Sequence, residues 1–142
     1  LDRWRGRGEH LEAACEIVIL LDDPDRCDEI LDVARAEAEH GELEALRYFA
    51  DRLEGRMASG PGDLPRARDC LERSADGFAR LGAPWEEAWS RLLLAEAIAE
   101  LGPGADAETQ LARALPIFER LRSVGEIERA RSVLSRLTTP RP

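Results

Sequence analysis

The sequence contains no lysine, and all 20 of its basic residues are arginines. This absence excludes lysine Schiff-base chemistry and the lysine of a phosphate-binding P-loop. Aspartate and glutamate together number 29, so the formal net charge at pH 7 is −9. A chain with this charge is a poor candidate for general contact with a nucleic-acid backbone, and we expect no direct nucleic-acid partner.

Aromatic residues and long apolar runs are also scarce. Aromatics make up 5% of the chain, so leucine and alanine must supply most of a core. The longest apolar run, residues 17–21, is far too short to span a bilayer, and no membrane partner is expected. The first residues lack the apolar segment of a signal peptide, which predicts a cytoplasmic location.

The three cysteines, Cys15, Cys27 and Cys70, form no CxxC pair, so the spacing of zinc ligands is absent. An odd number of cysteines without a secretion signal is typical of the reducing cytosol. Cys15 and Cys27 lie where paired helices are expected to meet, which favours buried small residues over a redox pair. We therefore expect no metal and no cofactor.

Apolar residues recur at helical spacing along the chain, and sustained two-residue alternation is absent. We predict an all-α fold in a single domain, residues 1–142. Turns rich in glycine and proline divide the chain into three antiparallel helix pairs and a last helix, at about 8–41, 42–82, 84–122 and 125–137. The last helix has one polar and one apolar face, which is typical of a cap at the end of a repeat stack.

Three local features refine this prediction. Asp23 before Pro24 is expected to cap the second helix. Residues 59–65 are interpreted as a local insertion between two helices. Pro116 lies inside a predicted helix, and we expect a bend there because proline removes one backbone hydrogen bond.

A pattern of small residues and leucine recurs on successive helices. The first copy is Cys15–Cys27–Leu31–Ala34 and the last is Ala95–Ala107–Leu111–Ala114, and both begin with the same interval of twelve positions. A middle copy, Ala50–Ala67–Leu71–Ser74, begins with a longer interval and is interpreted as distorted. Small residues at fixed positions allow two helices to approach closely, which is typical of helical-repeat solenoids.

These residues resemble the tetratricopeptide repeat (TPR), whose period is about 34 residues. The resemblance implies a right-handed solenoid that binds other proteins. Segments 78–93 and 112–137 are similar to repeats of large bacterial regulators, in which a P-loop ATPase and a LuxR-type DNA-binding domain or a cyclase accompany such a region. The sequence has no ATPase, cyclase or helix-turn-helix motif, so those activities do not carry over.

The TPR resemblance implies a groove lined by the first helix of each pair. Counting from Cys15, Ala50 and Ala95 gives a strongly acidic surface with one aromatic anchor. We predict that it binds a basic or amphipathic protein segment; the alternative is a solvated charged helix face. The candidate residues are Glu12, Glu16, Arg47, Asp51, Glu54, Trp89, Leu92, Glu96 and Glu100.

The leading functional prediction is a non-catalytic interaction module of a larger bacterial regulator. Catalysis is not expected, because His10 and His40 have no evident partner and no nucleophile–base pair is visible. One alternative is a homo-oligomerisation module, since no clear polar cap precedes Leu11. Another is a small-ligand sensor with a pocket near Trp85 and Trp89.

Overall fold

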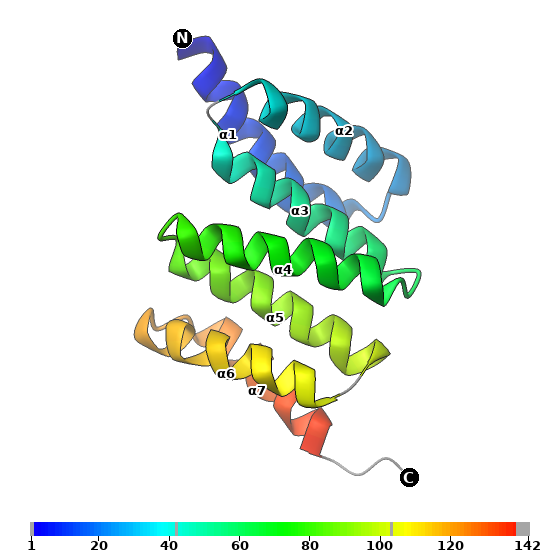
Figure 1. Ribbon diagram of the computed structural model, residues 1–142, viewed down its shortest axis with the longest axis vertical. Helices are drawn as coiled ribbons and strands as arrows, with labels where there is room; N and C mark the ends of the chain where they lie inside the picture. The colour runs from blue at the N-terminus through cyan, green and yellow to red at the C-terminus, as the bar shows by residue number, and fades with distance from the viewer. Residues whose placement is uncertain (1, 42, 103, 139–142) are drawn as a thin grey trace.

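The computed structural model describes residues 2–41, 43–102 and 104–138, with their side chains from residue 8 onward. Over these residues the chain forms seven α-helices, one short 3-10 helix and no strand, which confirms the all-α prediction. The elements, drawn in Figure 1, are α1 (Asp2–Ile17), η1 (Val18–Leu21), α2 (Pro24–His40), α3 (Glu44–Ser59), α4 (Leu64–Arg80), α5 (Pro84–Leu101), α6 (Gly104–Arg120) and α7 (Val124–Thr138).

The same local signal starts α2 and α4. The Asp23 carboxylate accepts a hydrogen bond from the backbone N–H of Arg26 at 3.2 Å, and Pro24 occupies the first turn. Asp63 accepts from the backbone N–H of Arg66 at 3.2 Å in the same way. The cap predicted at Asp23 is therefore confirmed, and Asp63 provides an equivalent cap on the next helix of this kind.

Two predicted boundaries need correction. In the pair expected at 8–41, the first helix is α1, which begins at Asp2 and is followed by the 3-10 turn η1, and Asp22 ends this segment with a left-handed φ of 52°. α3 continues through Ser59, so the connection to α4 covers only residues 60–63. α6 runs through Pro116 as one helix.

The helices form two layers. Each helix packs against the next one along the chain, and the odd-numbered helices also contact one another in succession, α1 with α3, α3 with α5 and α5 with α7. Among the described residues, α2, α4 and α6 make no such contacts with each other. We call α1, α3, α5 and α7 the odd layer and α2, α4 and α6 the even layer. Figure 1 shows the helices stacked along the long axis, with the two termini at opposite ends.

A forty-residue unit repeats through the structure. α2, α4 and α6 are each 17 residues long and begin at positions 24, 64 and 104. α3, α5 and α7 begin at positions 44, 84 and 124. The predicted capping helix, α7, therefore occupies the place of the first helix in a further unit. Leu53, Leu93 and Val133 stand at the same place in successive units, and all three are buried, which supports this equivalence.

The middle copy of the small-residue pattern is regular, contrary to the prediction. Gly55, rather than Ala50, stands one unit after Cys15 and one unit before Ala95. The interval from Gly55 to Ala67 is also the same as that from Cys15 to Cys27. The interpretation of residues 59–65 as an insertion is therefore wrong, because the spacing from Gly55 to Ala67 is unchanged across them and both ends of the range belong to helices.

Gly55 explains why this unit keeps the spacing without an alanine. A Cβ added to Gly55 would lie 2.6 Å from Cγ of Leu71 and 3.3 Å from the carbonyl oxygen of Ala67. Real Cβ atoms do not approach a buried leucine so closely, so only glycine permits this contact between α3 and α4.

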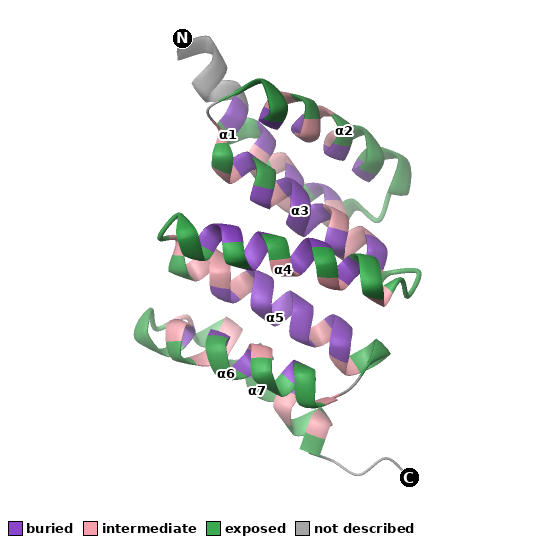
Figure 2. Ribbon diagram, in the orientation of Figure 1, coloured by how far each residue is buried: buried purple, intermediate pink, exposed green. Residues whose placement is uncertain are grey.

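The core consists of two clusters, one across α1, η1, α2 and α3, and the other across α4 to α7. Aromatic rings connect α3 to α4, since Tyr48 and Phe49 both pack edge-on against Phe78 with centroids 5.8 and 5.0 Å away. Figure 2 shows buried residues concentrated on α3, α4 and α5, in the middle of the stack.

Candidate partner-binding groove

A groove of about 350 Å³ crosses the odd layer. Its lining comes from η1, α3, α5 and α7, with one residue from α4. Because successive units contribute to it, the groove exists only in the assembled stack. Its charged residues are Arg56, Glu96, Glu100, Arg129 and Arg136, and its apolar residues are Ile19, Leu71, Leu93 and Ala97.

Charges alternate along one row of the odd layer. Glu16, Arg56, Glu96 and Arg136 each stand one unit after the other and occupy the same place in successive units. Three of the four line the groove, and Glu16 lies on α1, the helix that leads into η1. The row therefore presents an acid, a base, an acid and a base in turn.

Arg52 binds the first acid of this row. Its side chain is fully buried, and its Nε donates to the Glu16 carboxylate at 2.8 Å. Its two Nη groups donate to the carboxylate and the backbone carbonyl of Glu86, at 2.5 and 3.2 Å. The rings of Phe49 and Phe78 each lie 5.1 Å from the Arg52 guanidinium carbon. One cation thus joins α1, α3 and α5 and satisfies Glu16.

The second acid is also satisfied within the protein, whereas the two bases are not. Both carboxylate oxygens of Glu96 accept from Arg129, at 2.6 and 2.8 Å, in a bidentate pair. Arg56 and Arg136 have no hydrogen-bond or ion-pair partner among the described residues. The groove therefore keeps two arginines whose donors are free.

Trp89 lies beneath two arginines of the groove. The guanidinium carbons of Arg56 and Arg129 are 5.8 and 4.9 Å from its ring centroid. Trp85 stacks against it with centroids 5.9 Å apart. The Trp89 indole N–H is buried and has no hydrogen-bond partner, an uncommon state for a tryptophan. Neither tryptophan is among the residues lining this groove.

Burial lowers the pKa of Arg56, and it is the largest influence on this group. The like charges of Arg129 and Arg52 lower the pKa further, while Glu16 and Glu96 oppose them from a distance. Arg56 is therefore a half-buried cation without a direct counter-ion, which is electrostatically unfavourable.

Only part of the predicted set lies at this groove. Of the predicted residues, Glu96 and Glu100 line the groove. Trp89 contacts two arginines of the groove, and Glu16 binds Arg52. Glu12 is half-buried on α1, where burial first, and then Glu9 and Glu86, raise the pKa of its carboxyl. Leu92 is fully buried in the core and lines no surface.

Arg47, Asp51 and Glu54 face the even layer, and the reason is the incorrect register of the middle copy. The predicted residues of α3 were counted from Ala50 instead of Gly55, an offset of five positions. On an α-helix this offset turns the predicted face by about 140°. The residues that α3 directs toward the groove are Arg56 and Ser59.

Four arginines of the site were not predicted from the sequence: Arg52, Arg56, Arg129 and Arg136. Aligning the chain with itself at an offset of one unit would have placed Arg56 and Arg136 in the row of Glu16 and Glu96. No sequence signal identifies Arg52 as buried, because its partners come from other helices.

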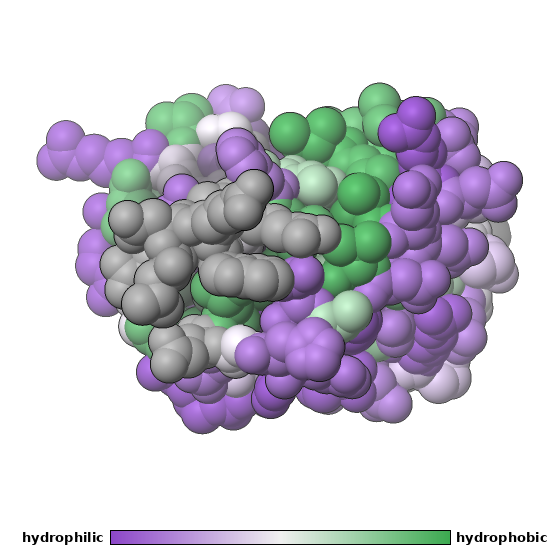
Figure 3. All heavy atoms as spheres, turned by 90° about the horizontal axis from the view of Figure 1, so that it is seen from above, coloured by the Kyte–Doolittle hydropathy of each residue, from purple (hydrophilic) through white to green (hydrophobic). Residues whose placement is uncertain are grey.

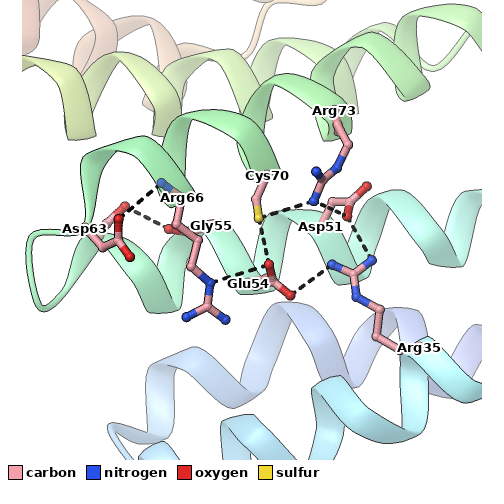
Figure 4. Close-up of polar contacts among 9 residues, drawn as sticks. Arg35, Asp51, Glu54, Gly55, Asp63, Arg66, Cys70 and Arg73 are labelled. Carbon is pink, nitrogen blue, oxygen red and sulfur yellow. Dashed lines mark hydrogen bonds and ion pairs between the residues drawn. The ribbon is translucent and has the colours of Figure 1, made fainter.

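Two of the three predicted residues that face the even layer, Asp51 and Glu54, belong to a charged cluster between α2, α3 and α4 (Figure 4). The buried Asp51 carboxylate pairs with Arg35 at 2.8 Å and with Arg73 at 3.5 Å. Glu54 accepts from Arg35 at 3.2 Å and from the Cys70 thiol at 2.9 Å. Together these contacts bind the first two even helices to α3.

A second pocket of about 500 Å³ lies over this cluster and includes the exposed Arg47. Asp51 already pairs with two arginines there, and Asp76 pairs with Arg91 at 3.4 Å. Arg47 and Arg80 have no ion-pair partner among the described residues, so this pocket combines paired acids with unpaired arginines.

The buried thiols are poor nucleophiles. Burial raises the pKa of Cys15 to about 12. Burial, followed by its hydrogen bond to Glu54, raises the pKa of Cys70 to about 12. Thiols with such values remain protonated at neutral pH. Within the described residues, no group of histidine, cysteine, aspartate and glutamate is arranged to hold a metal ion.

An apolar surface lies at the N-terminal end of the stack. Figure 3 looks onto this end and shows apolar side chains gathered beside the residues drawn in grey. Ile17, Leu20 and Leu21 are 57%, 72% and 59% exposed. Large aliphatic side chains grouped in this way are a feature of interaction surfaces.

The chain matched no protein-family model, no curated protein and no solved structure. Among the helices of the described residues, none combines the length and the apolar character needed to cross a membrane.

Proposed function

We propose that this chain is a non-catalytic protein-binding module with TPR-like stacking, and that the groove across the odd layer receives a segment of its partner. The observation that carries the proposal is the groove itself, lined mainly by η1 and three helices of the odd layer and holding two arginines without counter-ions. Repeat stacks use such shared surfaces to bind extended segments.

The spacing of small residues supports the TPR-like assignment. Each of the three copies places buried small residues at the same interval on a helix pair, at Cys15 and Cys27, at Gly55 and Ala67, and at Ala95 and Ala107. The forty-residue unit is longer than the usual TPR period of about 34 residues. By resemblance, the module belongs to a larger cytoplasmic bacterial regulator.

Selection of random displayed peptides on the immobilised chain tests the proposal. We expect enriched peptides to shift the backbone amide NMR signals of Ser59, Ala97 and Glu100, which line the groove. Shifts confined to the second pocket, at Arg47 and Arg80, would contradict the assignment of the groove, and so would a failure to enrich any peptide.

Homo-oligomerisation is the second candidate function, favoured by the exposed Ile17, Leu20 and Leu21. The monomer mass is 15.8 kDa. Light scattering after size exclusion is expected to show a larger particle that returns to this mass in a Leu20→Glu, Leu21→Glu variant. A monomer at all concentrations would eliminate this candidate.

A further inference from the structure

The row of charges along the odd layer leaves only cations unpaired, although Glu100, which lines the groove outside this row, also has no ion-pair partner among the described residues. In the row of Glu16, Arg56, Glu96 and Arg136, both acids are bonded to arginines of the protein, at distances of 2.6 to 2.8 Å. Arg56 and Arg136 have no such partner among the described residues. The whole chain carries a net charge of −9, but the two side chains of this row that remain unpaired are positively charged.

Arg56 is positioned to bind a carboxylate. Its guanidinium carbon lies over the Trp89 ring, 5.8 Å from the centroid, so the ring takes up none of its hydrogen-bond donors. A guanidinium edge matches a carboxylate with two parallel hydrogen bonds. An incoming carboxylate would also supply the direct counter-ion that this half-buried cation lacks.

The apolar part of the groove requires an apolar contact beside that carboxylate. Ile19, Leu93 and Ala97 line the same cavity as Arg56 and Arg136. A polyanion without apolar side chains, such as a nucleic-acid backbone, does not match this aliphatic lining. A polypeptide segment that alternates acidic and aliphatic side chains satisfies both the arginines and the aliphatic residues.

We propose that the groove of the odd layer recognises an acidic segment of a partner protein, with Arg56 and Arg136 binding its carboxylates and Ile19 and Leu93 packing against its aliphatic side chains. This inference rests on the proposed protein-binding function and reverses the charge of the partner expected from the sequence.

Three synthetic peptides of equal length test it, each carrying the same leucines interspersed with glutamate, glutamine or lysine. Binding is measured by fluorescence anisotropy at low and at physiological ionic strength. We expect the glutamate peptide to bind most tightly and to weaken with salt. Arg56→Gln is expected to weaken its binding about tenfold, the usual effect of losing a charged hydrogen-bond partner.

Arg113→Gln is the matched control, because Arg113 is exposed on α6 in the even layer. It is expected to leave the affinity unchanged. Circular dichroism checks that each variant folds, and the exposed Arg136→Gln replaces Arg56→Gln if the latter does not.

The outcomes separate this inference from the proposed function. Equal or tighter binding of the glutamine or lysine peptide would overturn the acidic partner while leaving a peptide-binding groove. Equal effects of Arg56→Gln and Arg113→Gln on the glutamate peptide would also overturn it. If no peptide of the three binds, the acidic partner is rejected, and the displayed-peptide selection decides the function independently.

Discussion

Arg52 shows how much a single side chain contributes to this stack. It is fully buried, and its donors reach carboxylates on α1 and α5 while its guanidinium carbon lies 5.1 Å from the centroids of two phenylalanine rings. A lysine would not reproduce this arrangement, because an ammonium lacks the flat, multiply donating edge of a guanidinium.

Replacing Arg52 by methionine is expected to destabilise the protein by about 3 kcal/mol. This value is at the lower end of the destabilisation that follows when one partner of a buried ion pair is removed. Glu16 and Glu86 keep 30% and 28% exposure and regain some hydration, which moderates the loss. Urea denaturation measures the change. Arg113→Met, at an exposed site, is expected to change stability by less than about 0.5 kcal/mol. Similar losses in both variants would show that Arg52 is not a tie between helices.

Glu12 and Glu54 are expected to respond to pH in opposite ways. Burial, with help from Glu9 and Glu86, raises the pKa of Glu12, so its charged form is disfavoured in the fold. For Glu54, burial acts upward, but its bonds to Cys70 and Arg35 outweigh burial and lower the pKa. The contribution of Glu12 to folding stability is present below its ordinary pKa and is lost as the pH rises through its raised pKa. The contribution of Glu54 is present above its ordinary pKa and is lost as the pH falls through its lowered pKa.

Glu12→Gln should therefore raise the melting temperature at pH 7, and Glu54→Gln should lower it. The Glu12→Gln difference should shrink as the pH falls toward the ordinary glutamate pKa of about 4, and the Glu54→Gln difference should shrink only as the pH falls below it. Thermal melts followed by circular dichroism across this range give the measurement. Shifts of the same sign at pH 7 would contradict the assigned environments.

At the scale of helices, Gly55 sets the distance between α3 and α4. Gly55→Ala is expected to destabilise by about 1–3 kcal/mol, because overpacking against the buried Leu71 outweighs the better helix propensity of alanine. Gly125→Ala on α7 is the control, since an added Cβ meets nothing within 4 Å there. A Gly55→Ala variant as stable as the control would mean that the two helices separate at little cost.

Some features of the helix pairs could be predicted from local sequence patterns, and others could not. The cap at Asp23 and the first and last small-residue copies are local patterns, and they were predicted from spacing alone. The middle copy has glycine at position 55 where the other copies have cysteine or alanine, so the small residue predicted at Ala50 was incorrect. Glycine is unfavourable inside helices, so its role became evident only when Leu71 was seen to occupy the space of its missing Cβ.

The whole molecule has two core clusters in sequence along the stack, and this division predicts local rather than global effects. Val133→Ala in α7 removes buried methyl groups at the C-terminal end and is expected to destabilise by about 2 kcal/mol. Amide hydrogen exchange should speed up in α5, α6 and α7 and change little in α1 and α2, because each unit contacts only its neighbours.

Leu31→Ala in the N-terminal cluster is the matched variant, with the reverse pattern expected. If both variants accelerated exchange uniformly along the chain, the stack would unfold as one cooperative unit, contrary to this expectation.

Local spacing in the sequence determined the helices, their order and the positions at which they approach one another. These properties depend on residues within one or two turns, or on a repeat that can be read along the chain. The tertiary structure alone decided which charges are free, because Arg52, Arg56 and Arg129 meet their neighbours across separate helices. The predicted acidic surface thus became a row of charges in which Glu16 and Glu96 are paired with arginines, while Arg56 and Arg136 have no ion-pair partner among the described residues.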